Sequence, residues 1–142
     1  MPVTRVDLAH HSPAARLRLA AEIIVAYARV RSTMRANEPT EAVAKLRAYA
    51  RRHPIAADRD GELVAGWRLG RAVTRTLRLL PTDSRCLMRS LTLLTMMERR
   101  SLSPSLVIAV KQGPFAAHAW IELHGEALLP VGGPEYERIT QI

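Results

Sequence analysis

The sequence predicts an α+β domain in which helices come first and a small antiparallel sheet follows. Apolar residues recur at helical spacing up to about residue 100. Short β-branched runs follow Pro104, and His124-Gly125 is a plausible two-residue hairpin turn between two of these runs. Helices and strands therefore occupy separate halves of the chain, as is typical of α+β proteins.

The helical part covers residues 12–80. Ser12 is a suitable N-cap for the first helix, and Pro13 suits the first helical position. Pro39 and Thr40 are expected to separate the first helix from the second. The predicted helices span 12 to about 35, 41–52 and 62–80. The residues expected in the core are Leu17, Ala20, Ile23, Ile24, Tyr27, Val30, Val43, Leu46, Ala50, Leu63, Val64, Trp67, Leu69, Val73 and Leu77.

A fourth helix is expected to begin close to Cys86, the only cysteine of the chain, and to run to about Arg100. Turn and capping residue types precede it, and Asp83 or Ser84 is the expected cap. Cys86 then lies in the first turn, where unpaired N–H groups and the helix dipole stabilise a thiolate by roughly 0.3–1 kcal/mol at an exposed site. Nearby arginines, Arg85 and Arg89, act in the same direction.

Three strands are predicted after this helix, at 105–110, 115–123 and 126–131. His118 and Trp120 share one face of the second strand, because side chains alternate along a strand. A first-turn cysteine beside a histidine on a neighbouring strand is the arrangement that cysteine peptidases and transglutaminases use for a Cys–His pair.

Three strings of residues occur in order here: CLMRSL at 86–91, LVIAV at 106–110 and FAAHAWIE at 115–122. They are close to the patterns C-L-x-R-S-L, L-V-I-G-V and F-x-A-H-A-W-V-E. Over about residues 80–136 the chain therefore resembles the transglutaminase-like leader peptidases of lasso peptide biosynthesis. Each string alone is weak, and the specificity comes from their order and spacing.

The resemblance implies a transglutaminase-like, papain-like fold with Cys86 as nucleophile and His118 as general base and acid. Such enzymes cut a ribosomal precursor peptide between its leader and its core, and a separate cyclase then closes the ring. With helices before the cysteine, the chain looks like the stand-alone peptidase. Its implied partners are the precursor (leader) peptide, a separate leader-binding recognition protein and the lasso cyclase.

One departure from the family pattern concerns the group that orients the histidine. The family places an aspartate about a dozen residues after the histidine, whereas residues 128–133 of this chain contain no carboxylate. Counting along a hairpin that turns at His124-Gly125 puts Val131 opposite His118. The orienting role is left to Glu135, to a backbone carbonyl or to water. Trp120 is open to two interpretations, packing beneath the site or contact with substrate.

The length of 142 residues suggests a single domain, with the helical part at 12–80 and the cysteine helix and sheet at 81–142. No uncharged run of 18 residues is present for a membrane span, and residues 1–11 lack the apolar run of a secretory signal. A lone cysteine permits no intrachain disulfide, which fits a reducing cytoplasm. His10, His11, His53 and His124 lack metal-ligand spacing, so no metal and no cofactor are expected.

The chain is strongly basic, with 21 Lys and Arg against 13 Asp and Glu and a net charge of +8. Several arginines step by three or four residues, as on a solvated helix face: Arg68, Arg71, Arg75 and Arg78. This charge is open to three interpretations, a solvated surface, a docking face for an acidic leader or partner, or a nucleic-acid site. Aromatic residues are only 4% and no nucleic-acid-binding motif is found, so nucleic acid is disfavoured.

Two further classes of function remain as alternatives. The missing carboxylate is compatible with a non-catalytic scaffold for the precursor or the cyclase, built on a degenerate thiol-peptidase fold. The basic charge is compatible with a small nucleic-acid-binding protein. A transglutaminase that joins glutamine to lysine shares the site chemistry but fits the strings less well.

Overall fold

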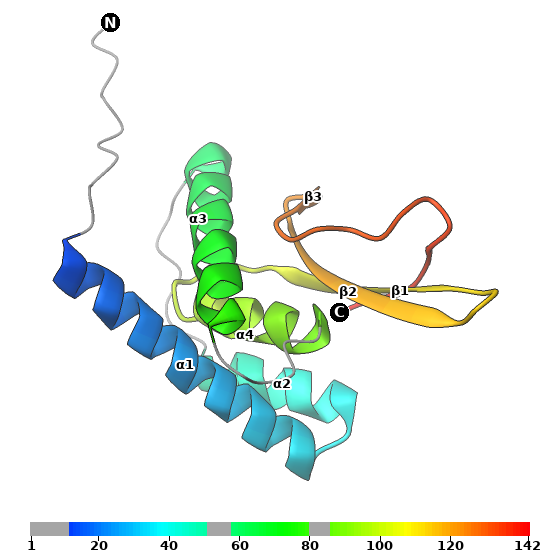
Figure 1. Ribbon diagram of the computed structural model, residues 1–142, viewed down its shortest axis with the longest axis horizontal. Coiled ribbons are helices and arrows are strands. Elements are labelled where there is room, and N and C mark those ends of the chain that lie inside the picture. Colours follow the sequence, from blue (N-terminus) through cyan, green and yellow to red (C-terminus); the bar gives the residue numbers. More distant parts are fainter. Residues whose placement is uncertain (1–11, 51–57, 80–85) are drawn as a thin grey trace, which may run out of the picture.

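The computed structural model describes residues 12–50, 58–79 and 86–142. Within these ranges the chain forms helices first and strands afterwards, which confirms the predicted α+β class (Figure 1). The helices are α1 (Pro13–Ala36), α2 (Pro39–Ala50), α3 (Arg59–Arg78) and α4 (Cys86–Glu98), and the strands are β1 (Ser105–Lys111), β2 (Ala116–Leu123), β3 (Glu126–Ala127) and β4 (Glu137–Gln141).

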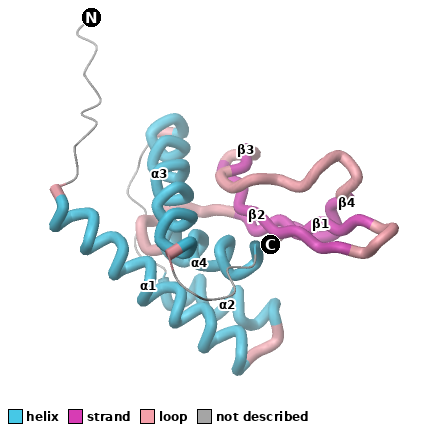
Figure 2. The backbone as a smooth tube through the Cα atoms, viewed as in Figure 1, coloured by secondary structure: helices cyan, strands magenta, loops and turns pink. Residues whose placement is uncertain are grey.

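Helix α4 is the central element of the fold. It contacts α1, α2 and α3 and also packs on β1 and β2, so it joins the helical layer to the sheet (Figure 2). Its residues 90–97 are all buried because neighbours surround it on several sides. The largest fully buried side chains come from both layers and include Ile23, Leu46, Leu77, Leu91, Met96, Met97, Leu106 and Ile121.

The sheet is antiparallel with strand order β3-β2-β1-β4. β2 and β3 are joined by the predicted turn, where His124 and Gly125 have φ values of 52° and 79°. Both lie in the left-handed region, which a type I′ hairpin turn requires. The third strand is shorter than predicted and ends at Ala127. β4 was not predicted from the sequence, and it pairs with the free edge of β1.

Two helix starts differ from the sequence prediction. α2 begins at Pro39, which fits a first helical position because its fixed φ and missing N–H suit that place. α3 begins at Arg59, three residues before the predicted 62, because the Asp58 side chain accepts a hydrogen bond from Gly61 N at 3.1 Å and caps the helix. The predicted capping residues Asp83 and Ser84 lie outside the described residues.

Four residues predicted in the core are instead exposed: Leu17 (72%), Ile24 (42%), Val64 (41%) and Trp67 (43%). The buried stripe of α1 is confined to positions 23–30, and Leu17 lies about two turns before it and on a different side of the helix. On α3, Trp67 lies at the border of the buried face and its indole N–H donates to the Ala127 carbonyl at 3.4 Å.

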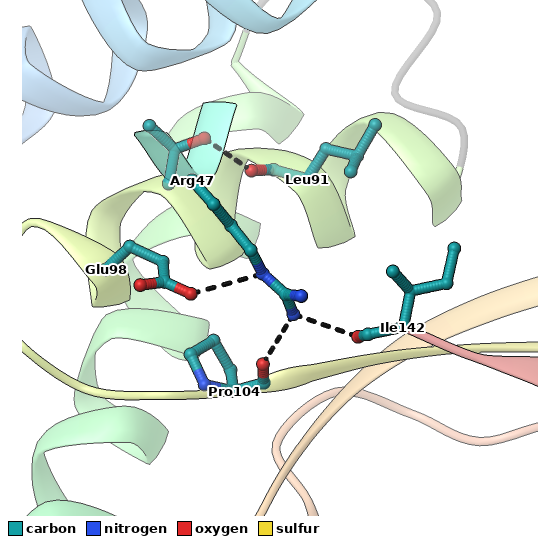
Figure 3. A network of polar contacts seen from close by, with 6 residues as sticks. Arg47, Leu91, Glu98, Pro104 and Ile142 are labelled. Carbon is teal, nitrogen blue, oxygen red and sulfur yellow. Dashed lines mark hydrogen bonds and ion pairs between the residues drawn. The ribbon is translucent and has the colours of Figure 1, made fainter. Parts of the chain in front are cut away.

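One arginine ties the helical layer to the sheet. Arg47 of α2 donates through Nη2 to the carbonyl oxygens of Pro104 and Ile142, each at 2.9 Å (Figure 3). Its Nε lies 3.2 Å from a carboxylate oxygen of Glu98, at the last residue of α4. These contacts fix the end of α4 that is remote from Cys86 against the start of β1.

Candidate active site

Cys86 is the first residue of α4, as the sequence predicts. The first N–H groups of a helix have no partner within the helix, and they carry the positive end of its dipole. Cys86 is half-buried, and its Sγ accepts a hydrogen bond from the backbone N–H of Ala119 on β2 at 3.3 Å. The sulfur therefore lies between a helix start and a strand amide that donates to it.

His118 directly precedes Ala119 on β2, so the Cys86 sulfur contacts the peptide group that joins these two residues. The imidazole Nε2 is 2.7 Å from the carbonyl oxygen of Pro130. A carbonyl oxygen only accepts, so Nε2 donates and carries the ring proton, which leaves the lone pair of the neutral ring on Nδ1. Both side chains are described, and no hydrogen bond between Sγ and the imidazole is formed in this arrangement.

Two aromatic rings flank the histidine. The ring centroids of Trp120 and Tyr136 lie 5.8 and 5.9 Å from that of His118. The first contact confirms that His118 and Trp120 share a face of β2. Tyr136 comes from the segment between β3 and β4, which returns across this side of the sheet.

The structure places a backbone carbonyl, and not a carboxylate, on the histidine. Glu135 is exposed, with its carboxylate 3.9 Å from the Lys111 ammonium. Both residues lie in the described ranges, and Glu135 makes no hydrogen bond to His118. Hairpin counting reached Val131, one residue beyond Pro130, and the paired part of the third strand ends earlier, at Ala127.

Trp120 is only 5% exposed, which favours packing beneath the histidine over contact with a substrate. Its indole N–H donates to a carboxylate oxygen of Glu122 at 2.9 Å. Glu122 is buried too, and Arg138 of β4 forms an ion pair with it while lying over the Trp120 ring, 5.7 Å from its centroid. The row of side chains beside His118 is thus held by a buried, paired carboxylate.

Sequence reasoning left a backbone carbonyl open as the orienting group but did not assign it to Pro130. It missed two other contributors, the N–H of Ala119 and the ring of Tyr136. The carbonyl and the N–H are backbone groups and have no residue-type signature. The usable signal was the hairpin register, which places residue 130 opposite residue 119.

Four arginines of α3 form the basic row that the sequence indicates. Arg68, Arg71, Arg75 and Arg78 are all exposed, and in the part of the chain that the structure describes they have no ion-pair partner. This agrees with a solvated basic face. None of the helices within the described ranges has the length and apolar character that crossing a bilayer requires.

The fold and the helix-start cysteine beside a strand histidine define a class of protein. The chain belongs to the transglutaminase-like superfamily, whose family model matches residues 6–142. Comparison with curated proteins finds no match, and comparison with solved structures finds none. The superfamily and the α+β fold are therefore established, and the particular reaction is a matter of proposal.

Proposed function

We propose that the protein is a cysteine peptidase that removes the leader from a ribosomally made lasso peptide precursor before macrocyclisation. The observation that carries the proposal is the position of Cys86 Sγ. It lies at a helix start and accepts a hydrogen bond from the residue that follows His118, whose Nε2 is held by a carbonyl. The strings at 86–91, 106–110 and 115–122, which resemble lasso leader peptidases, support the choice of substrate.

The proposed reaction is amide hydrolysis through a thioester. His118 accepts the thiol proton at Nδ1, and the Cys86 sulfur forms a bond to the carbonyl carbon at the leader–core junction. N–H groups at the start of α4 stabilise the oxyanion. His118 then donates the proton to the departing amine of the core as the C–N bond breaks. Water hydrolyses the thioester, which frees the leader as a carboxylic acid and returns the thiol.

The proposed partners follow from the same reaction. The precursor is the substrate, a separate leader-binding recognition protein presents it, and the lasso cyclase consumes the released core. We expect slow cleavage by the isolated chain and fast cleavage with the recognition protein. Equal rates with and without that protein would contradict the partner proposal. A free thiol nucleophile suits the reducing cytoplasm.

The test uses a lasso peptide precursor and a leader-binding recognition protein, with mass spectrometry of the leader and core. Cys86→Ala and His118→Ala are each expected to abolish cleavage while keeping the circular dichroism spectrum and melting temperature of the parent. His124→Ala is the matched control, because His124 lies in the hairpin turn and contacts Glu62 instead of the site. Full activity in either site variant would end the proposal.

A separate measurement decides against the rival functions. Iodoacetamide is expected to label Cys86 at neutral pH faster than it labels free cysteine, and failure to label would favour a non-catalytic scaffold. Salt-dependent retention on DNA or RNA would support the nucleic-acid-binding alternative.

A further inference from the structure

The hydrogen-bond ladder between β2 and the third strand stops where the site begins. In an antiparallel ladder, hydrogen-bonded pairs recur at every second residue. Leu128 N donates to Ile121 O at 2.8 Å, so the next such pair would be Ala119 with Pro130. That pair does not form. Ala119 N donates to Cys86 Sγ instead, and Pro130 O accepts from His118 Nε2.

We propose that Pro130 is the positioning residue of the Cys86–His118 pair, an inference that rests on the proposed thiol chemistry. Proline contributes in two ways. Its carbonyl fixes the imidazole with the proton on Nε2 and the lone pair on Nδ1. Its missing N–H removes one of the two hydrogen bonds of this pair, so pairing here is weaker and the Ala119 amide is more readily left to the sulfur.

Any other residue at position 130 restores a backbone N–H. That group can donate to the Ala119 carbonyl, and the reciprocal bond from Ala119 N to the carbonyl of residue 130 completes an ordinary antiparallel pair. The completed pair uses the same two atoms that hold Sγ and Nε2. Strand pairing and the site therefore use the same donor, Ala119 N, and the same acceptor, the carbonyl of residue 130. The missing N–H of proline weakens the strand pairing and so favours the site.

The position of the Pro130 carbonyl is fixed by the residues before it. Leu128 and Leu129 are each only 7% exposed, and they pack against α3 and α4. The contact with α3 is close, because a Cβ on Gly70 would lie 2.8 Å from the Leu128 carbonyl oxygen. A carbonyl anchored in this way can orient a ring as a carboxylate side chain would, without depending on a flexible side chain.

The first experiment uses the wild-type protein and measures the ¹⁵N chemical shifts of the His118 ring, assigned by their loss in His118→Gln. The expected signature of the neutral ring is a protonated Nε2 and an unprotonated Nδ1. A neutral ring with the proton on Nδ1 would overturn the proposal, because that tautomer cannot donate to Pro130.

The second experiment compares Pro130→Ala with Pro134→Ala, a control in the same segment at an exposed position. The rate of Cys86 labelling by iodoacetamide at neutral pH is expected to fall at least about tenfold in Pro130→Ala, since the hydrogen bonds that hold Sγ and Nε2 are lost. Pro134→Ala should label at the wild-type rate, and the two variants should melt together.

Wild-type labelling by Pro130→Ala would overturn the proposal. So would a melting temperature clearly below that of Pro134→Ala, because that result identifies a packing residue. Neither experiment uses a precursor peptide. The positioning role can therefore fail while leader cleavage is observed, and it can stand if the substrate proves to be a different one.

Discussion

Gly70→Ala tests whether α3 sets the position of the site through the backbone of residue 128. Gly70 is buried in the middle of α3, and an added Cβ would lie 2.8 Å from the Leu128 carbonyl oxygen and 3.6 Å from Leu93 Cδ2. A backbone oxygen cannot rotate away, so the segment that leads to Pro130 must shift. Pro130 is two residues further on, and its carbonyl holds His118.

Two contributions of opposite sign set the change in the free energy of unfolding for Gly70→Ala. Alanine is better than glycine inside a helix by about 1 kcal/mol. Overpacking a closely packed contact costs about 1–3 kcal/mol, and the backbone partner places this contact toward the upper end. We expect a net loss of about 1–2 kcal/mol, which for a chain of this size lowers the melting temperature by about 3–8 °C. Iodoacetamide labelling of Cys86 should slow as well, because the His118 acceptor moves.

Gly66→Ala is the matched control, one turn earlier on the same face. Its Cβ would meet Leu128 Cδ1 at 2.7 Å, the end of a side chain that can rotate, so the helix gain should nearly offset the contact. Thermal unfolding and the labelling rate are measured for both variants. The reasoning is refuted if Gly70→Ala melts at or above the wild type and labels normally, or if Gly66→Ala is equally damaging.

Three further predictions concern the stability of the chain. Arg47→Met should destabilise the chain by about 2–3 kcal/mol in urea titrations, because a carboxylate loses its cation and two backbone carbonyls lose their donor; an unchanged midpoint would contradict this. Arg138→Gln should lower the free energy of unfolding more than Glu122→Gln does. It leaves the buried carboxylate without its cation, whereas the half-exposed guanidinium that remains in Glu122→Gln can be solvated; equal urea midpoints would argue against this. The double variant Arg71→Gln, Arg75→Gln removes two like charges at i,i+4, whose repulsion destabilises a helix by about 0.2–0.5 kcal/mol. This variant should therefore melt no lower than the wild type, and a clear drop in melting temperature would indicate a structural contact.

The sequence was sufficient for features that depend on local signals. Ser12 and Pro13 marked the start of α1, and the Ser12 side chain does accept a hydrogen bond from Ala15 N at 3.2 Å. His124-Gly125 marked the hairpin turn through residue types that tolerate positive φ. Cys86 was placed at a helix start for the same reason, since capping and turn residue types come just before an apolar helical pattern.

β4 could not be predicted, because it has none of the signals of a buried strand. All five of its residues are exposed, so their sequence shows no alternation of apolar and polar side chains. The strand forms through backbone pairing with β1 and through the ion pair between Arg138 and Glu122. Those contacts join residues remote in sequence, and they depend on β1 already having a free edge.

The exposed positions of Leu17 and Trp67 show a second limit. Helical spacing of apolar residues does not show which of them lie on the side that a neighbour covers. The buried stripe of α1 runs from Ile23 to Val30, and at 3.6 residues per turn Leu17 lies on a different side of the helix, so it reaches solvent.

The orienting group of the histidine shows a third limit, and it bears on how the site works. A search for a carboxylate finds Glu135, which is exposed and beside Lys111, because residue types cannot reveal a backbone carbonyl. A carbonyl stabilises an imidazolium less than a carboxylate does, since hydrogen bonds to an ionised acceptor are roughly twice as strong. The thiolate form of Cys86 must then depend more on the groups around the sulfur, which are the start of α4 and the N–H of Ala119. In the proposed arrangement Pro130 supplies the weaker acceptor, and because it lacks an N–H it also weakens the strand pairing that would compete for the Ala119 donor.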